Sequence, residues 1–165
     1  MQSVISDSST LIHLSRIGRL GLLRDLFTRV VVPSAVWREV VLGGKGRTGA
    51  AELETAFRAG WIEPATPTNT QLLRLLSRDL DEGESEVIAL GLERESSLLL
   101  LDETDARQVA ERYDLSKTGT IGVLMRAKHE GKIISLREEL DKLRIVGGFW
   151  IEGKLIEQAL RAVGE

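Results

Sequence analysis

Short apolar runs alternate with longer segments of helical spacing, and this alternation is the feature that most constrains the fold. The runs at residues 4–5, 30–32, 61–64 and 98–101 have the length and composition of short strands. Apolar residues in the segments between them recur at intervals typical of helices. Strands that are separated by helices favour right-handed crossovers and a parallel sheet covered on both faces. We therefore predict an α/β fold with three layers, α/β/α, around a central, mainly parallel sheet.

The helices are predicted from apolar spacing and from signals at their ends. Pro33 closes the second strand, and Ser34 is expected to be the N-cap of a helix that contains Val36 and Trp37. Residues 42–49 contain four glycines and are expected to form a mobile loop. The other helices are predicted at residues 8–14, 17–27, 50–59, 72–76, 81–94, 104–113, 118–129, 136–143 and 153–163.

The length of 165 residues suits one domain, and an apolar fraction of 42% is ordinary for a soluble globular protein. We place the main body at residues 1–150 and treat residues 151–165 as a C-terminal helix of the same domain. The longest apolar run, within residues 97–101, is too short to cross a bilayer, and the first residues show no signal-peptide pattern. We expect no membrane association and a cytoplasmic location.

Charge and cysteine content limit the chemistry. The chain has no cysteine, so a metal ion would be held by oxygen atoms or by its two histidines. A net charge of −3 argues against a protein that coats nucleic acid, because such proteins carry a basic excess. It is compatible with a nuclease, since cations bound in an acidic cleft restore attraction for phosphate.

Carboxylates follow the ends of the predicted strands. Asp7 comes directly after the first strand and Asp102 directly after the fourth, while Glu39, Glu84 and Glu86 lie in the first turns of helices. In an open parallel sheet, ligands bind beyond the carboxyl ends of the strands. Each acid alone could cap a helix or complement its dipole. Together they would repel one another unless a cation held them, and this favours a metal site.

Five segments carry a resemblance to a known family. They are residues 4–9, 32–40, 81–90, 100–103 and 118–124, which read VISDSS, VPSAVWREV, DEGESEVIAL, LLDE and TGTIGVL. The sequence resembles the PIN-domain nucleases, and within them an uncharacterised toxin-like (VapC-like) branch, over roughly residues 1 to 150. The resemblance implies that the main body is a PIN-like nuclease domain.

The resemblance implies a metal-dependent endoribonuclease with an acidic quartet of Asp7, Glu39, Glu84 and Asp102. The sequence departs from the family pattern at the third position, where it offers two glutamates instead of one aspartate. We favour Glu84 because we expect it on the buried side of its helix, and because its separation from Asp102, 102 − 84 = 18, resembles that of toxin-like relatives. Side chains expected to support the four acids are Ser8, Ser9, Glu86, Glu103, Asp105 and Thr120.

Mg²⁺ or Mn²⁺ is the expected cofactor, since carboxylate oxygens and water satisfy such hard cations. The ion would activate a water for in-line attack on phosphorus, and the products would carry a 5′-phosphate and a 3′-hydroxyl. The resemblance also implies an RNA substrate, a small antitoxin that occludes the cleft, and a homodimer. Hydrolysis of RNA as the toxin-like member of a toxin-antitoxin pair is the favoured function.

Basic residues and histidines give weaker indications. Lys45, Arg47 and Arg107 are candidate RNA contacts, although a solvated loop or a surface salt bridge would explain them as well. His13 and His129 lack the spacing of a zinc site, and His13 is expected to be a structural helix residue. A PIN-like module that binds RNA or protein without cutting is the main alternative. A receiver-like phosphoprotein is disfavoured, because the second strand is followed by proline and not by aspartate.

Overall fold

The computed structural model describes residues 2–95 and 97–165, and in this part of the chain five strands form one parallel sheet. The strand order is β3-β2-β1-β4-β5, so the first strand lies at the centre. The strands are β1 (Ser3–Ser6), β2 (Arg29–Pro33), β3 (Ile62–Ala65), β4 (Leu98–Leu100) and β5 (Lys117–Thr118). The predicted sheet is therefore confirmed, with β5 as a strand that the sequence analysis missed.

The central strands are buried on both sides. Val4 pairs with Val30 on one neighbour and with Leu98 on the other, and Ile5 pairs with Val31 and Leu99. A sheet covered on both faces favours continuous apolar runs over alternating ones, as these strands show. At one edge, Pro64 of β3 pairs with Val32, and at the other edge β5 is two residues long.

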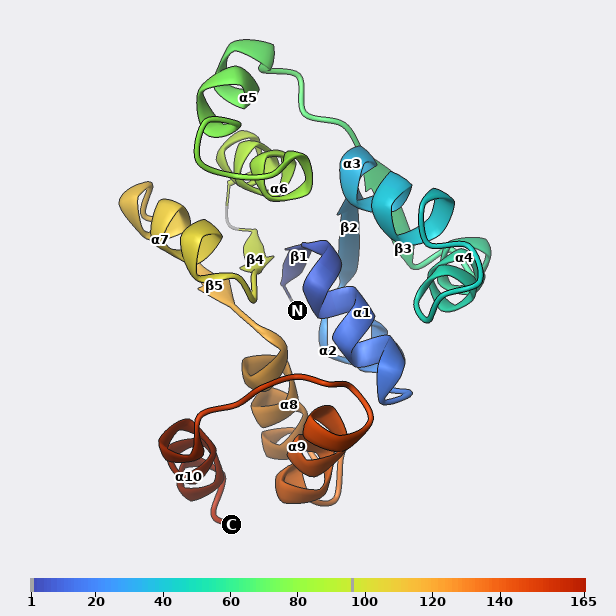
Figure 1. The fold of residues 1–165 in the computed structure, drawn as a ribbon, viewed down its shortest axis with the longest axis vertical. Helices are drawn as coiled ribbons and strands as arrows, with labels where there is room; N and C mark the ends of the chain where they lie inside the picture. The colour runs from blue at the N-terminus through green and yellow to red at the C-terminus, as the bar shows by residue number, and fades with distance from the viewer. Residues whose placement is uncertain (1, 96) are drawn as a thin grey trace.

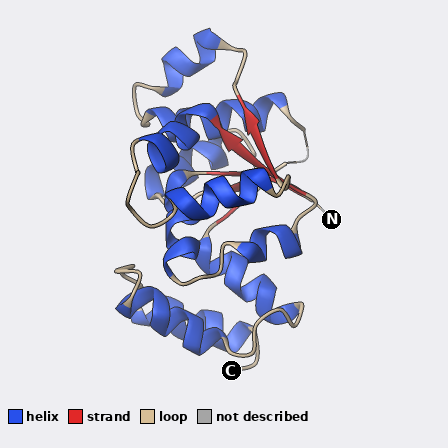
Figure 2. Cartoon of the chain, turned by 90° about the vertical axis from the view of Figure 1, so that its right-hand side faces the viewer, coloured by secondary structure: helices blue, strands red, loops and turns tan. Residues whose placement is uncertain are grey.

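Helices cover both faces of the sheet, as Figures 1 and 2 show. Helix α6 (Glu82–Glu93) packs against β1, β2 and β4, with α3 (Ser34–Trp37), α5 (Thr70–Leu76) and α7 (Thr104–Arg112) beside it. Helix α8 (Thr120–His129) contacts α1 (Ser8–Arg16) and α2 (Gly21–Leu26), and α4 (Ala50–Arg58) lies against β3. This is the three-layer α/β/α fold that the sequence predicts.

The last helices form an outer group below the sheet in Figure 1. Helix α9 (Leu136–Ile145) packs on α8, and α10 (Gly153–Ala162) packs on α9. The side chain of Glu165 accepts hydrogen bonds from the backbone N–H groups of Leu136 (2.7 Å) and Arg137 (3.0 Å) at the start of α9. These bonds join the C-terminal end of the described chain to α9. Across the described residues, every helix is too short or too polar to span a membrane.

Two local predictions are wrong. A helix was expected from residue 17, but Gly18 has a φ of 69° and breaks the chain there, so α2 begins at Gly21. Pro33 occupies the N-cap position of α3, and the Ser34 hydroxyl donates to Glu86 Oε2 (3.0 Å) instead of capping the helix. The helix expected after Ser34 is present as α3, and it continues as a π-helix, η1 (Arg38–Leu42).

Candidate functional site

The carboxyl ends of β1 and β4 bring Asp7 and Asp102 together. The backbone N–H of Asp7 donates to the carbonyl oxygen of Leu100 (3.0 Å), which continues the ladder between these strands. The backbone N–H of Asp102 in turn donates to Asp7 Oδ2 (3.0 Å). Two acids 95 positions apart in the sequence are thus adjacent because their strands are hydrogen-bonded neighbours.

Asp7 is buried, with only 3% of its surface exposed. Its Oδ1 accepts from the backbone N–H of Thr10 (2.8 Å), so Asp7 is the N-cap of α1. Burial, and then the nearby charge of Asp102, raise the pKa of Asp7 to about 7, although these hydrogen bonds oppose the change. The capping role is therefore confirmed, and it leaves the metal-ligand role that the sequence suggested open to Asp7.

Asp102 is held by two side chains and one backbone group. Its Oδ1 accepts from the backbone N–H of Thr120 (2.8 Å), and its Oδ2 accepts from the Thr120 hydroxyl and from His13 Nδ1 (2.8 Å). Burial disfavours the charged form, but the hydrogen bonds from His13 and Thr120 outweigh it, and the pKa of Asp102 lies below its ordinary value. Asp102 is therefore an ionised, firmly oriented carboxylate.

A cavity of about 200 Å³ opens in front of Asp7. It is bordered by acids from four separate parts of the chain and by two serines. The lining residues are Asp7, Ser8, Ser9, Glu39, Asp81, Gly83, Glu84 and Glu103. Within the described part of the chain, no lysine, arginine or histidine contributes to this lining. The cavity is thus surrounded by negative charge.

The two serines orient carboxylates at the rim of this cavity. The Ser8 hydroxyl donates to Glu39 Oε2 (2.6 Å), and the Ser9 hydroxyl donates to Glu103 Oε1 (3.2 Å). Both serines lie in the first turn of α1, directly after Asp7. One short sequence, DSS, therefore supplies one acid and positions two others.

Glu84 faces the cavity, whereas Glu86 points elsewhere. Burial raises the pKa of Glu84 above its ordinary value, and the charges of Asp81, Glu103 and Asp105 add to this effect. The prediction that Glu84 lies on the buried side of its helix is wrong, because Glu86 is the buried residue, at 6% exposed, and Glu84 is half-buried. Glu86 Oε2 accepts from the backbone N–H of Ala35 (2.7 Å), so it anchors the start of α3 and does not line the cavity.

Glu39 reaches the cavity from the π-helix η1. A π turn places one extra residue in a helical turn, and such turns are frequent at functional sites. Gly44 follows η1 closely, and a Cβ there would lie 2.2 Å from the carbonyl oxygen of Val40. Only glycine therefore fits where the chain leaves the segment that carries Glu39.

Basic side chains occur near the acids but outside the acidic cavity. Arg16 and Arg47 line a neighbouring cavity of about 410 Å³ that shares Glu39 with it. Lys45 is exposed in the same loop, and neither Lys45 nor Arg47 pairs with a described carboxylate. Arg107, a candidate RNA contact, donates from Nη1 to the carbonyl oxygen of Leu101 (2.8 Å) and thereby supports the end of β4.

Two participants were not predicted from the sequence, and Asp105, like Glu86, lies outside the cavity. His13 was expected to be only structural, yet its ring is hydrogen-bonded to Asp102. Its position on the helix that begins directly after Asp7 could have indicated this role. Asp81 lines the cavity and caps α6 by accepting from the backbone N–H of Glu84 (2.7 Å), as the spacing Asp81–Glu84 could have indicated. Asp105 lines a separate cavity with Asp79.

The donor set fits a hard divalent cation in its chemistry. Carboxylate oxygens are the ligands that Mg²⁺ and Mn²⁺ prefer, and this cavity offers several of them without a basic partner in the described part of the chain. In the structure these oxygens surround the cavity without converging: among residues 2–95 and 97–165, no three His, Cys, Asp or Glu side chains form a closed cluster. Glu39, Glu84 and Glu103 are long side chains at the rim that could move inward.

The fold and the site define an α/β protein that collects carboxylates beyond the carboxyl ends of adjacent parallel strands, where such folds bind ligands. Residues 3–165 match a family model described as a PIN domain, and the chain therefore belongs to the PIN-domain family. PIN domains are typically nucleases that use divalent metal ions, so a nucleic-acid substrate is implied. A comparison with curated proteins gives no match.

Proposed function

We propose that this protein is a metal-dependent endoribonuclease that hydrolyses RNA phosphodiester bonds. The observation that carries the proposal is the cavity in front of Asp7, which is lined by acids from separate elements and, among the described residues, by no basic side chain. An arrangement of this kind costs free energy when it is empty, because gathered carboxylates repel one another. It becomes favourable when a divalent cation enters.

Asp7, Glu39 and Glu84, which line the cavity, would hold the ion directly. Asp102 does not line the cavity, but its backbone N–H donates to Asp7 Oδ2, and it is proposed as the fourth ligand. When bound, Mg²⁺ or Mn²⁺ would activate a water and stabilise negative charge on the scissile phosphate. His13 and Thr120 keep Asp102 ionised and fixed in orientation. Ser8 and Ser9 steer the long side chains at the rim, and Glu103 adds negative charge beside them.

The cavity next to Glu39 supplies a contact for the RNA backbone. Arg47 has no acidic partner among the described residues and lies in the glycine-rich loop, while Arg16 comes from α1. Guanidinium groups bind phosphate well, because they donate parallel hydrogen bonds. Arg47, with Lys45 nearby in the loop, is therefore proposed to bind a phosphate next to the one that is cleaved.

Cleavage assays test the proposal directly. Purified protein should cut single-stranded RNA with Mg²⁺ or Mn²⁺ and should stop when EDTA is in excess. Asp7→Asn should abolish cleavage with the fold retained, whereas Asp25→Asn, an exposed aspartate on α2, serves as the matched control. Equal rates for wild type and Asp7→Asn, or undiminished cleavage in EDTA, would reject the metal mechanism.

The alternative is a PIN-like module that binds RNA or a protein without cutting. The exposure of Glu39 and the lack of convergence among the acids are the observations that favour it. A silent module would still bind RNA but would show no metal-dependent cleavage of tRNA, rRNA or mRNA. Manganese titration by calorimetry separates the two, since a silent module should give no binding that depends on Asp7.

The biological setting of the proposal rests on the toxin-like resemblance. By that resemblance the protein is proposed to be a homodimer whose cleft is occluded by a small antitoxin, and the cytoplasm is the proposed location because the sequence shows no signal-peptide pattern. Expression alone should then arrest growth, and co-expression with the product of a neighbouring small gene should relieve the arrest. Light scattering at micromolar concentration tests the dimer, and a monomeric mass would remove it from the proposal.

A further inference from the structure

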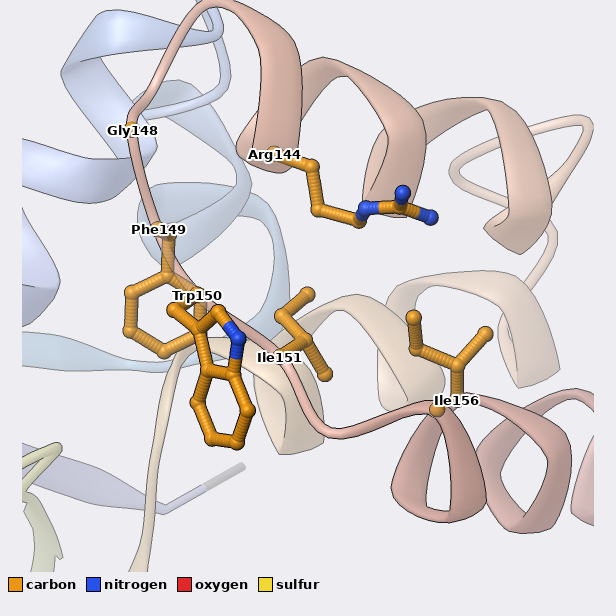
Figure 3. Close-up of a pocket in the computed structure, with 7 residues that line it drawn as sticks. Arg144, Gly148, Phe149, Trp150, Ile151 and Ile156 are labelled. Atoms are coloured by element: carbon orange, nitrogen blue, oxygen red, sulfur yellow. The ribbon is translucent and has the colours of Figure 1, made fainter.

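A further cavity, of about 430 Å³, lies at the C-terminal side of the molecule. Figure 3 shows that Arg144 enters it from α9, Ile156 from α10, and Phe149, Trp150 and Ile151 from the segment that joins the two helices. Its volume is in the range of small-ligand sites. Its lining combines one cation with aromatic and aliphatic side chains.

Trp150 is the most unusual of these residues, because 83% of its surface is exposed. Burying a tryptophan side chain is strongly favourable, so an indole that remains in solvent commonly marks a binding surface. In Figure 3 the indole extends from the joining segment, and Ile151 lies between it and Ile156. A flat face is thus available for stacking.

The segment that carries Trp150 is attached at two points to α1, the helix that Asp7 caps. Phe149 packs edge-to-face against the His13 ring, with 4.4 Å between ring centroids, and His13 in turn holds Asp102. Arg16 Nη1 donates to the carbonyl oxygen of Gly147 (2.9 Å), and Arg16 also lines the cavity beside Glu39. The indole therefore starts one residue from Phe149, whose ring packs on the histidine that holds Asp102.

Positive charge accompanies the aromatic face. Arg144 is half-exposed, and its ion pair with Asp141 is loose, with 3.8 Å between Nη1 and Oδ1. Such a surface pair contributes little, so the guanidinium is free to engage another anion. Trp150 and Arg144 thus line one cavity. An exposed aromatic ring and a nearby arginine together suit single-stranded nucleic acid, because bases stack on the ring and phosphates meet the cation.

We propose that Trp150 and Arg144 form a subsite for one unpaired nucleotide of the RNA strand that enters the acidic cavity. The base stacks on Trp150 and its phosphate meets Arg144. This inference rests on the proposed function, since it takes RNA as the substrate. A protein partner on the neighbouring exposed side chains Ile145 and Val146 is the competing occupant. The charge of Arg144 and the connection through Phe149 to the acidic site favour RNA.

The test measures RNA affinity in an Asp7→Asn background, so that binding is read without cleavage. A short fluorescent single-stranded RNA is titrated with protein, and anisotropy is followed at several salt concentrations. Trp150→Leu should weaken binding by about 10-fold, whereas Trp150→Phe should keep most of the affinity, because only phenylalanine offers an aromatic face. Arg144→Ala should weaken binding and reduce the salt dependence by about one phosphate contact.

Matched controls come from the same chain. Tyr113→Ala removes another exposed aromatic side chain, just beyond the C-terminal end of α7. Arg58→Ala removes an arginine on α4 whose pair with Glu54 is also 3.8 Å long. Both controls should bind RNA like the parent protein.

Three results would overturn the inference. Trp150→Leu could bind RNA like the parent, Trp150→Phe could lose as much affinity as Trp150→Leu, or Trp150→Leu could change the mass in light scattering with RNA binding unchanged. The last result would assign the surface to a protein contact. The proposed function is tested separately. If wild type cleaves RNA and Trp150→Leu binds RNA like the parent, only this inference is rejected. Trp150-dependent binding without any cleavage rejects only the nuclease.

Discussion

The buried carboxylate of Asp7 predicts how the stability of the metal-free protein depends on pH. Its pKa is raised from 3.8 to about 7, first by burial and then by Asp102. The unfolded chain releases this proton near pH 3.8, whereas the folded chain keeps it up to about pH 7. Between these values the folded state binds more protons than the unfolded state. Stability should therefore be highest at the acidic end of this window and fall as pH rises.

The size of the effect follows from the same shift. Each pH unit inside the window should lower the free energy of unfolding by about 1.4 kcal/mol, or by roughly 4 kcal/mol over the whole window. The lowered pKa of Asp102 contributes only below pH 3.8, outside the window. The raised pKa of Glu84 acts in the same direction as that of Asp7, so a comparison between variants is needed to isolate Asp7.

Urea unfolding of wild type and Asp7→Asn in EDTA provides that comparison. Asparagine cannot accept from both Thr10 and Asp102, and this loss should cost about 1–3 kcal/mol at every pH. The difference in unfolding free energy between the two proteins should nevertheless change by about 2 kcal/mol from pH 5 to pH 7, with wild type losing stability. Near pH 8, Mn²⁺ should stabilise wild type and have less effect on the variant. A difference that stays constant with pH would refute the reasoning.

Three further predictions concern the acids and the chain end. Glu84→Gln should weaken Mn²⁺ binding in a calorimetric titration. Glu86→Gln should instead lower the free energy of unfolding by about 1–3 kcal/mol, because it weakens the hydrogen bonds that anchor α3. Weaker Mn²⁺ binding only in Glu86→Gln would reverse the assignment. Gly119→Ala should reduce RNA cleavage, since its Cβ would lie 2.6 Å from Asp102 Oδ1; unchanged activity in a gel assay would contradict this. Glu165→Gln should lower stability by about 1 kcal/mol at neutral pH. Since the pKa of Glu165 is lowered to about 2, this difference should fade as pH falls from 4.5 toward 2 in denaturant titrations.

The sheet could be predicted because its strands are buried on both faces. Runs such as Val30–Val32 are apolar without alternation, and this pattern together with the intervening helices determines the parallel sheet. β5 was missed because Lys117 and Thr118 are polar, and the strand exists only through pairing with Leu99 and Leu100. Tertiary pairing outweighs local propensity at such a position.

The acidic site was only partly visible in the sequence. Asp7 and Asp102 were found because strand ends meet at one edge of a parallel sheet, and the structure places them in contact. The choice of Glu84 over Glu86 rests on helical spacing within α6. Such spacing cannot show that Glu86 accepts a hydrogen bond from Ala35 of α3, a different helix. His13 escaped notice for a related reason, since its bond to Asp102 spans 89 positions.

The two edges of the sheet differ from its centre in a way that affects solubility. An open edge strand offers unpaired backbone groups to which a strand of another molecule could add. Here Pro64 removes a donor from the edge strand β3, and β5 at the opposite edge spans only Lys117 and Thr118. Proline, lysine and short length are all features by which natural proteins discourage growth of a sheet between molecules. Although its centre is rich in valine and leucine, this sheet is therefore poorly suited to extend into fibrils.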